Sequence, residues 1–286
     1  MRFLIHFLLT VIIIGQPVLA LSQETLTWAG CGITKKAFMA ELAKGFEEKT
    51  GVKIKLEGGG ATRGIRDAAE GLIDMGGSCR MNLPLSNPSE LYVTLHPVAW
   101  DGLAVLVHPS NPVQRISSEQ LKKIYTGKLT NWKSLGGPDR PIEVYVRNGK
   151  ISGVGYALRQ YLFRDSNKTF YSTRQFRSSG PLEKAIEKSP YAIGVSGVSS
   201  ARKRKVQIIG LDDIVPSPEN IKAGLYGLYR PLYIVTPPRP TGRVKEFIKF
   251  ATSKKGRQIM RDNQTVPYHD AIGLASKSVI YGLGVK

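Results

Sequence analysis

The chain has 286 residues and a formal net charge of +19, from 41 Lys and Arg against 22 Asp and Glu. This length is sufficient for one large domain or two ordinary domains with buried cores. So strong a basic excess usually suggests nucleic-acid binding, but the basic residues are scattered and form a run only at 202–205. With the export signal described next, this argues against nucleic acid and favours attraction of small anions or of an anionic membrane surface.

The first 20 residues have the pattern of a secretory signal peptide. One basic residue precedes an apolar core over 7–14, and small or aliphatic residues at 18–20 suit cleavage after residue 20. The apolar core is too short to span a bilayer, and the sequence at 15–17 interrupts it. Polar residues separate Cys31 from this core, so no lipid anchor is expected. We therefore predict a soluble, periplasmic, non-lipidated mature protein.

Strand and helix patterns alternate along the first part of the mature chain. The predicted strands are 25–29, 52–56 and 72–75, and the predicted helices are 34–49 and 65–70. Thr34 is the expected N-cap of the first helix. Alternation at this spacing is typical of a parallel sheet, in which ligand sites lie at the carboxyl ends of the strands.

Two glycine-rich turns, 58–64 and 74–80, follow the second and third predicted strands. Glycine allows the backbone to approach a ligand closely, and a turn that opens a helix directs unpaired N–H groups and the positive end of the helix dipole at one point. Arg63, Arg66 and Arg80 add positive charge to these turns. The pattern predicts an anion-binding pocket.

The second part of the chain repeats the α/β pattern. A long apolar strand over 98–107 ends at a segment broken by proline, and the helix over 117–125 has Ser117 and Gln120 at capping-box spacing. The remaining predicted elements are strands at 142–146, 191–195, 206–209 and 232–235 and helices at 154–163 and 243–260. Chain crossings near 107 and 221 divide the mature chain into a lobe of residues 21–106 plus 222–286 and an inserted lobe of residues 107–221. Such lobes, joined by two strands, would close around a ligand.

Several segments resemble the phosphate-binding proteins of ABC importers, which have the type II periplasmic binding protein fold. The matching segments are AGCGIT (29–34), GGGATRGI (58–65), DMGGSCR (74–80), DGLAVLVHPSNPV (101–113), LKKIYTGKLTNWKSLGG (121–137), RNGKISG (147–153) and GLYGLYRPLYIVT (224–236). The resemblance implies an α/β fold of two lobes, each a mainly parallel sheet flanked by helices, with a two-strand hinge. It also implies capture of an oxyanion, with phosphate expected, by a monomer that delivers it to an ABC importer.

The same resemblance assigns the ligand-binding residues. They are Thr34, Ala61, Thr62, Arg63, Cys79, Arg80, Arg147, Ser152 and Gly153. Hydroxyl groups, backbone N–H groups and a bidentate Arg147 would supply the donors that an oxyanion needs. The chain departs from the family pattern at Ala61, where serine is expected, and at Cys79, where phosphate binders have an acidic or hydroxyl side chain. A weak acceptor at Cys79 predicts less discrimination against fully ionised anions, or a preference for another oxyanion.

The two cysteines, Cys31 and Cys79, follow the first and third strands, which are neighbours in the sheet order of the family. A disulfide between them is the expected pairing in an oxidising compartment. Two alternatives remain open: a pair of thiols that binds arsenite or a soft metal, and unpaired structural cysteines. A sensory binding protein of the same fold is a further alternative to transport.

Neither a metal site nor an enzyme is predicted. The histidines His96, His108 and His269 lack the spacing of metal ligands. No nucleophile stands in a pattern with a base, so no cofactor is expected either.

Overall fold

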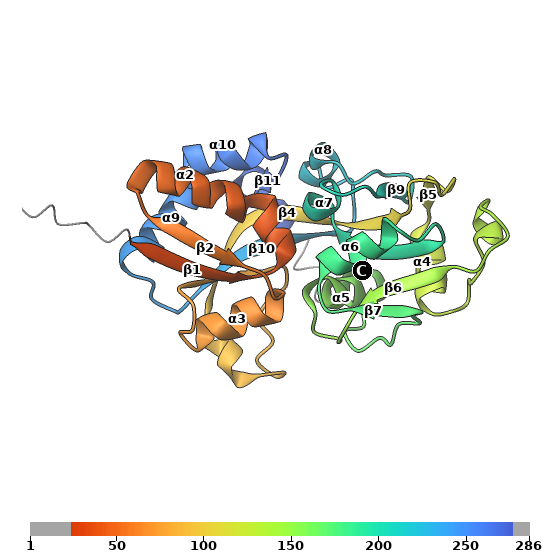
Figure 1. Cartoon of the computed structure of the whole chain (residues 1–286), viewed down its shortest axis with the longest axis horizontal. Coiled ribbons are helices and arrows are strands. Elements are labelled where there is room, and N and C mark those ends of the chain that lie inside the picture. The colour runs from red at the N-terminus through yellow and green to blue at the C-terminus, as the bar shows by residue number, and fades with distance from the viewer. Residues whose placement is uncertain (1–23, 277–286) are drawn as a thin grey trace, which may run out of the picture.

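The computed structural model describes residues 24–276, so the predicted signal peptide (1–20) lies outside the described residues. The chain forms two α/β lobes side by side, joined by long strands between them (Figure 1). Within residues 24–276, no helix is both long and apolar enough to cross a membrane. The predicted fold class, two lobes with helices flanking mainly parallel strands and a two-strand hinge, is confirmed.

The first lobe contains a mixed sheet between helices. Its strands are β1 (Thr25–Gly30), β2 (Lys53–Glu57), β3 (Met75–Ser78), β10 (Tyr229–Thr236), the first part of β4 (Thr94–Val107) and β11 (Val266–Pro267). Its helices are α1 (Gly32–Thr34), a π-helical turn (Lys35–Met39), α2 (Ala40–Thr50), α3 (Ala61–Ala69), α9 (Gly242–Thr252) and α10 (Lys254–Asp262), with 3₁₀ turns at Pro88–Leu91 and Tyr268–Ala271. Figure 1 shows α2, α9 and α10 over one face and α3 over the other. Strands β2, β1 and β3 are parallel, whereas β10 pairs antiparallel with β3 and β4.

The second lobe is built in the same way. Its strands are the second part of β4, β5 (Arg115–Ile116), β6 (Glu143–Arg147), β7 (Arg174–Phe176), β8 (Ala192–Gly197) and β9 (Gln207–Leu211). Its helices are α4 (Ser118–Tyr125), α5 (Gly153–Leu158), a π-helical turn (Arg159–Phe163), α6 (Ser179–Ile186), α7 (Val198–Ala201) and α8 (Pro218–Lys222), with a 3₁₀ turn at Trp132–Leu135. The predicted capping box is present, because Ser117 Oγ accepts from Gln120 N and Gln120 Oε1 accepts from Ser117 N.

A single strand, β4, runs through both lobes. It pairs with β10 up to Gly102 and with β8 from Leu103 onward. The second connection returns before β10, where Leu103 N donates to Leu228 O at 2.7 Å. The strand that pairs with β4 therefore changes from β10 to β8 between Gly102 and Leu103. The division of the chain into lobes at residues 107 and 221 stays a prediction.

Two local predictions were wrong. The third strand is Met75–Ser78 rather than 72–75, so the second glycine turn lies partly inside the sheet. Glycine is required there because a Cβ at Gly77 would lie 2.0 Å from Trp28 Cζ2 and one at Gly76 would lie 1.9 Å from the carbonyl oxygen of Gly64. The first helix begins at Gly32, with Cys31 and not Thr34 as its N-cap.

Candidate functional site

The carboxyl ends of β1 and β3 bring two sequence-predicted positions together. Cys31 follows β1 and Cys79 follows β3, and the two strands are paired at Gly30 and Gly77. Gly30 has φ of +155°, and a Cβ on it would lie 2.3 Å from the carbonyl oxygen of Gly77. The glycines at the carboxyl ends of these strands therefore allow the two chain segments to meet at the edge of the sheet that faces the other lobe.

The other lobe reaches the same place through the start of α5. A Cβ added to Gly153 would lie 2.3 Å from Cys79 Sγ and 3.1 Å from Ala61 Cβ, and a Cβ added to Gly60 would lie 3.9 Å from Arg147 Nη2. The structure thus assembles Cys31, Ala61, Cys79, Arg147 and Gly153, which we call the interlobe centre. Helices α1, α3 and α5 begin there, so their first N–H groups and dipole ends converge on it.

Arg147 supplies a buried positive charge at the interlobe centre. Its Nε donates to the carbonyl oxygen of Phe176 at 3.2 Å, its Nη1 to Ser179 Oγ at 2.9 Å and its Nη2 to the carbonyl oxygen of Arg177 at 2.5 Å. Burial lowers the pKa of the guanidinium, while the two cysteines act in the opposite direction. These contacts fix the orientation of the side chain before any ligand arrives.

Three predicted residues have contacts elsewhere. Arg63 lies at the surface, where it donates to Asp67 Oδ2 and Glu57 Oε2 at 2.9 and 3.0 Å. The hydroxyl of Thr34 is buried and donates to the carbonyl oxygen of Cys31 at 2.7 Å. The hydroxyl of Ser152 donates to the carbonyl oxygen of Gly149 at 3.1 Å. The ligand roles assigned to these side chains therefore stay predictions.

Arg80 and Thr62 connect the lobes. Arg80 Nε donates to the carbonyl oxygen of Ile151 in the second lobe at 2.9 Å, and Nη2 donates to Thr62 Oγ1 at 3.2 Å. The same guanidinium makes a bidentate ion pair with Glu90, whose side chain is fully buried. The charge of Arg80 is thus neutralised by Glu90, and the residue mainly holds the two lobes together.

Both cysteines are free in this structure, so the predicted disulfide is not formed here, although their predicted proximity is confirmed. The thiol of Cys31 donates to Cys79 Sγ across 3.0 Å. This hydrogen bond, followed by the nearby charges of Arg230 and Arg147, lowers the pKa of Cys79 to about 6 despite burial. The pKa of Cys31 is raised well above its usual value, first by its contact with Cys79 and then by burial. The contact between the two sulfurs therefore makes Cys79 the more acidic of the two thiols.

Sequence reasoning missed Arg230. Its side chain is buried, and its Nε donates to the carbonyl oxygen of Cys79 at 3.1 Å. Its Nη2 lies 3.5 Å from Asp101 Oδ2, but neither Nη1 nor Nη2 makes a hydrogen bond within residues 24–276. A lone charged residue in the apolar run of β10 was the available signal, since a buried arginine needs partners.

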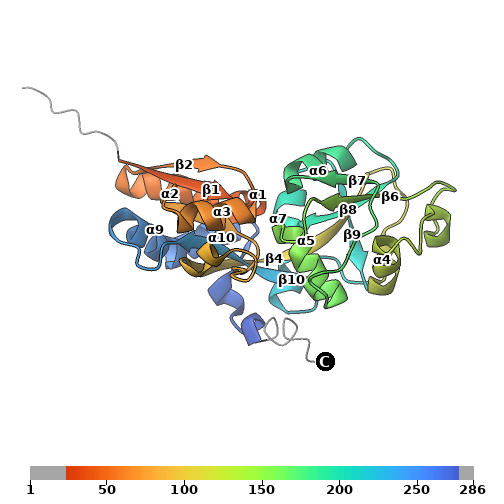
Figure 2. The ribbon, with the colours of Figure 1, turned by 90° about the horizontal axis from the view of Figure 1, so that it is seen from below.

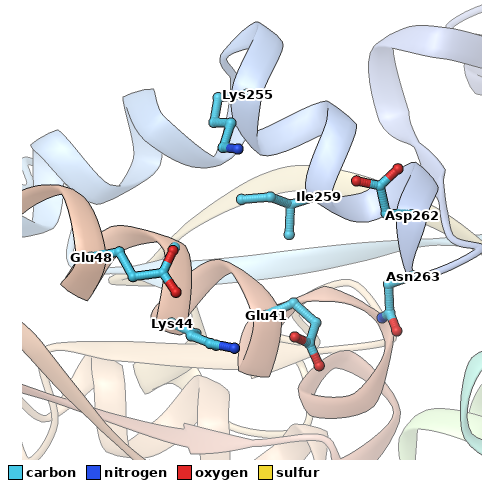
Figure 3. Close-up of a pocket in the computed structure, with 8 residues that line it drawn as sticks. Glu41, Lys44, Glu48, Lys255, Ile259, Asp262 and Asn263 are labelled. Atoms are coloured by element: carbon cyan, nitrogen blue, oxygen red, sulfur yellow. The ribbon is translucent and has the colours of Figure 1, made fainter.

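A separate surface groove runs between α2 and α10 (Figure 3). It is lined by side chains of both signs, among them Glu41, Lys44, Glu48 and Lys255. No residue of the interlobe centre contributes to it. Across the described part of the chain, no three histidine, cysteine or acidic side chains are grouped as metal ligands. The interlobe centre is therefore the candidate functional site.

Comparison with known proteins places this chain in a family. A family model for the PBP superfamily domain matches residues 22–255. The phosphate-binding protein PstS of Bacillus subtilis is 29% identical over 250 residues, covering 87% of this chain and 82% of that protein. A crystal structure of a putative phosphate ABC transporter substrate-binding protein from Clostridium perfringens, with bound phosphate, has a TM-score of 0.77 at 27% identity, covering 85% of this chain and 99% of that one.

A second solved structure, an ABC-type phosphate transport receptor from Vibrio cholerae, has a TM-score of 0.63 at 25% identity and covers 85% of this chain and 100% of that one. All these relatives are described as binding or transport proteins rather than enzymes, as the sequence predicted for this chain. The match of the family model over most of the chain, together with the two-lobe fold, shows that the chain belongs to the PBP superfamily.

Proposed function

We propose that this protein captures an oxyanion between its lobes, with phosphate as the expected ion, and delivers it to an ABC importer. The observation that supports this is the interlobe centre, where helix starts from both lobes meet beside the buried guanidinium of Arg147. Helix starts contribute about 0.3–1 kcal/mol each, and hydrogen bonds to a charged group about 1.5–3 kcal/mol. The relatives named above supply the identity of the ion and of the transporter.

Cys79 takes the place that an acidic or hydroxyl side chain has in the resembling family. The hydrogen bond from Cys31 lowers the pKa of this thiol, which favours the ionised form of its sulfur. An anionic sulfur can accept the proton of a hydrogen phosphate, so the departure at Cys79 keeps an acceptor at this position. On this reading the site favours a protonated oxyanion over sulfate, which carries no proton to donate.

The compartment and the assembly state are part of the proposal. The predicted signal peptide supports export to the periplasm without a lipid anchor, and the relatives described as ABC transport proteins support a permease as the partner. We propose that the protein acts as a monomer. A sensory protein of the same fold would report the ion to a membrane receptor instead, and a permease gene next to this one would decide for transport.

Titration calorimetry of the purified full chain with phosphate, arsenate, sulfate and molybdate tests the proposal. We expect micromolar binding of phosphate and arsenate at neutral pH, and at least a tenfold weakening in Arg147→Gln because a charge-assisted contact is lost. Arg243→Gln is the matched control, since this arginine pairs with Glu24 and Glu246 at the surface. The absence of binding for all four ions up to millimolar concentration would refute the proposal.

A second candidate function is capture of arsenite by the two thiols. The observation that favours it is the buried pair of free sulfurs, Cys31 and Cys79, 3.0 Å apart. Under reducing conditions, arsenite should bind the unmodified chain and should not bind Cys31→Ser. Equal arsenite binding by both proteins would exclude the thiols as the ligand.

A further inference from the structure

The basic run at 202–205 and Lys36 lie outside the interlobe centre, at the junction between the lobes. The run follows α7 of the second lobe, and Lys36 belongs to the π-helical turn after α1 of the first. Figure 2 shows α1 facing α6 and α7 across this junction. The charges of the run are therefore placed where they can reach the other lobe.

Two residues of the run donate hydrogen bonds to the first lobe. Arg202 Nη1 donates to the carbonyl oxygen of Gln264 at 2.6 Å, and Nη2 donates to that of Asn263 at 3.2 Å. Lys203 Nζ donates at 3.0 Å both to the carbonyl oxygen of Lys36 and to Asn263 Oδ1. Gln264 and Asn263 come just after the end of α10, where the partial negative charge of the helix dipole favours cations. Two cations of the second lobe thus bind oxygens of the first.

The accepting segment of the first lobe is held in shape by its own contacts. Gln264 has φ of +52°, in the left-handed region that non-glycine residues seldom adopt. Asn263 Nδ2 donates to the carbonyl oxygen of Lys36 at 2.9 Å, and Thr265 Oγ1 donates to that of Ala37 at 2.7 Å. A backbone conformation of this kind persists only where surrounding contacts require it, and it is often found at functional positions. The carbonyl groups that accept from the second lobe are therefore fixed in place.

A charged contact runs in the opposite direction, from the first lobe to the second. Lys36 Nζ lies 3.3 Å from Glu183 Oε2 and donates to Ser200 Oγ at 3.0 Å. The side chain of Glu183 is fully buried, and Arg204 Nε and Ser196 Oγ of its own lobe also donate to it, at 3.1 and 2.6 Å. An unpaired buried carboxylate is costly, but Glu183 keeps these two partners when Lys36 leaves. The contact can therefore break and form again as the lobes open and close.

We propose that Arg202, Lys203 and Lys36 are positioning residues for oxyanion capture, which hold the lobes together once the ion is between them and so slow its release. These roles rest on the proposed capture of an oxyanion between the lobes. The three side chains act on the ion through the position of the lobes, because their contacts are with oxygens of the opposite lobe. Contacts that form on closure stabilise the closed complex, and affinity differences between related complexes lie mostly in the dissociation rate.

Stopped-flow kinetics of inorganic phosphate with the full chain test these roles. In the double variant Arg202→Gln, Lys203→Gln we expect roughly tenfold faster dissociation, with an association rate within about threefold of the unmodified chain. Lys36→Gln removes a partly exposed ion pair from the other lobe and should accelerate dissociation about threefold. The double variant Lys188→Gln, Lys205→Gln is the control, because it removes the same charge from exposed lysines of the second lobe. The control should release phosphate at the rate of the unmodified chain.

The outcomes separate these roles from the proposed function. Phosphate release at one rate from all four proteins overturns the positioning roles and leaves phosphate capture intact. Lower thermal stability with unchanged release would show a structural role only and also overturns them, as does equally fast release from the control, which would assign the effect to net charge.

If none of the four proteins binds phosphate, the proposed function fails, and X-ray scattering of the ligand-free proteins then decides the positioning roles alone. A larger radius of gyration for Arg202→Gln, Lys203→Gln than for the control supports them, because the lobes have separated. Equal radii of gyration overturn them.

Discussion

At the scale of single residues, the contacts that an arginine makes determine whether its positive charge is available to the interlobe centre. Arg63, Arg80 and Arg147 all belong to glycine-rich turns that resemble anion sites, yet their environments differ. Arg63 is paired at the surface, Arg80 is neutralised by Glu90, and Arg147 is held by neutral oxygens of Phe176, Arg177 and Ser179. Of these three arginines, only Arg147 lies at the interlobe centre without a carboxylate in salt-bridge contact among the described residues.

The cysteine pair makes the stability of the reduced protein depend on pH. The pKa of Cys79 is about 6 in the fold against a usual 9.0, so the unfolded chain binds more protons between these values and stability rises with pH across that window. The raised pKa of Cys31 has the opposite effect, and stability falls as pH rises above 9.0. Urea unfolding with reductant should show a maximum near pH 9 that Cys79→Ser loses. Parallel profiles for the two proteins would contradict this assignment.

Glu90 is expected to be a residue on which stability depends strongly. Burial opposes its ionisation, but Arg80, the N–H of Leu83 and Arg66 lower its pKa overall, so it is charged. Glu90→Gln leaves the buried guanidinium of Arg80 without its counter-charge and should cost about 3–5 kcal/mol in urea unfolding. Glu57→Gln removes an exposed ion pair and should leave the unfolding midpoint nearly unchanged. Equal losses of stability in the two variants would show that the buried ion pair of Glu90 matters no more than the exposed ion pair of Glu57.

At the scale of elements, the start of α5 controls how closely the lobes approach. Gly153 lies against Cys79 and Ala61 of the other lobe, and there is no space for a Cβ. Gly153→Ala should hold the lobes apart, increase the radius of gyration measured by X-ray scattering and weaken oxyanion binding at least tenfold. Gly227→Ala is the control, because its Cβ would meet no atom within 4 Å. Tight binding and unchanged scattering by Gly153→Ala would show that closure does not require this contact.

At the scale of the whole molecule, the net charge of +19 should accelerate anion capture. The Debye length falls from about 30 Å at 0.01 M salt to about 8 Å at 0.15 M, so long-range attraction is screened over that range. Stopped-flow association of phosphate should slow several-fold between these salt concentrations, while dissociation changes much less. An association rate that is independent of salt would show that the distributed basic charge has no role in capture.

The sequence was informative wherever the signal is local. The capping box of Ser117 and Gln120, the strand-helix alternation and the glycine turns each depend on residues a few positions apart, so they could be predicted. The third strand was misplaced because Gly76 and Gly77 look like a turn, whereas they lie in the sheet, Gly76 against the backbone of Gly64 and Gly77 against Trp28. At these positions close packing overrides the turn propensity of glycine, and the sequence pattern alone does not describe that packing.

By itself, the sequence determined the α/β alternation, the glycine turns at helix starts, the basic excess and the predicted export signal. Only the tertiary structure decided which of the arginines face the interlobe centre, that the sulfurs of Cys31 and Cys79 lie 3.0 Å apart, and that Arg230 is buried beside Cys79. The physical reason is the distance along the chain between partners. Arg230 meets the carbonyl of Cys79 across 151 positions, and Arg80 meets the carbonyl of Ile151 across 71. Burial, pKa and charge depend on such contacts, which exist only once the two lobes have folded against each other.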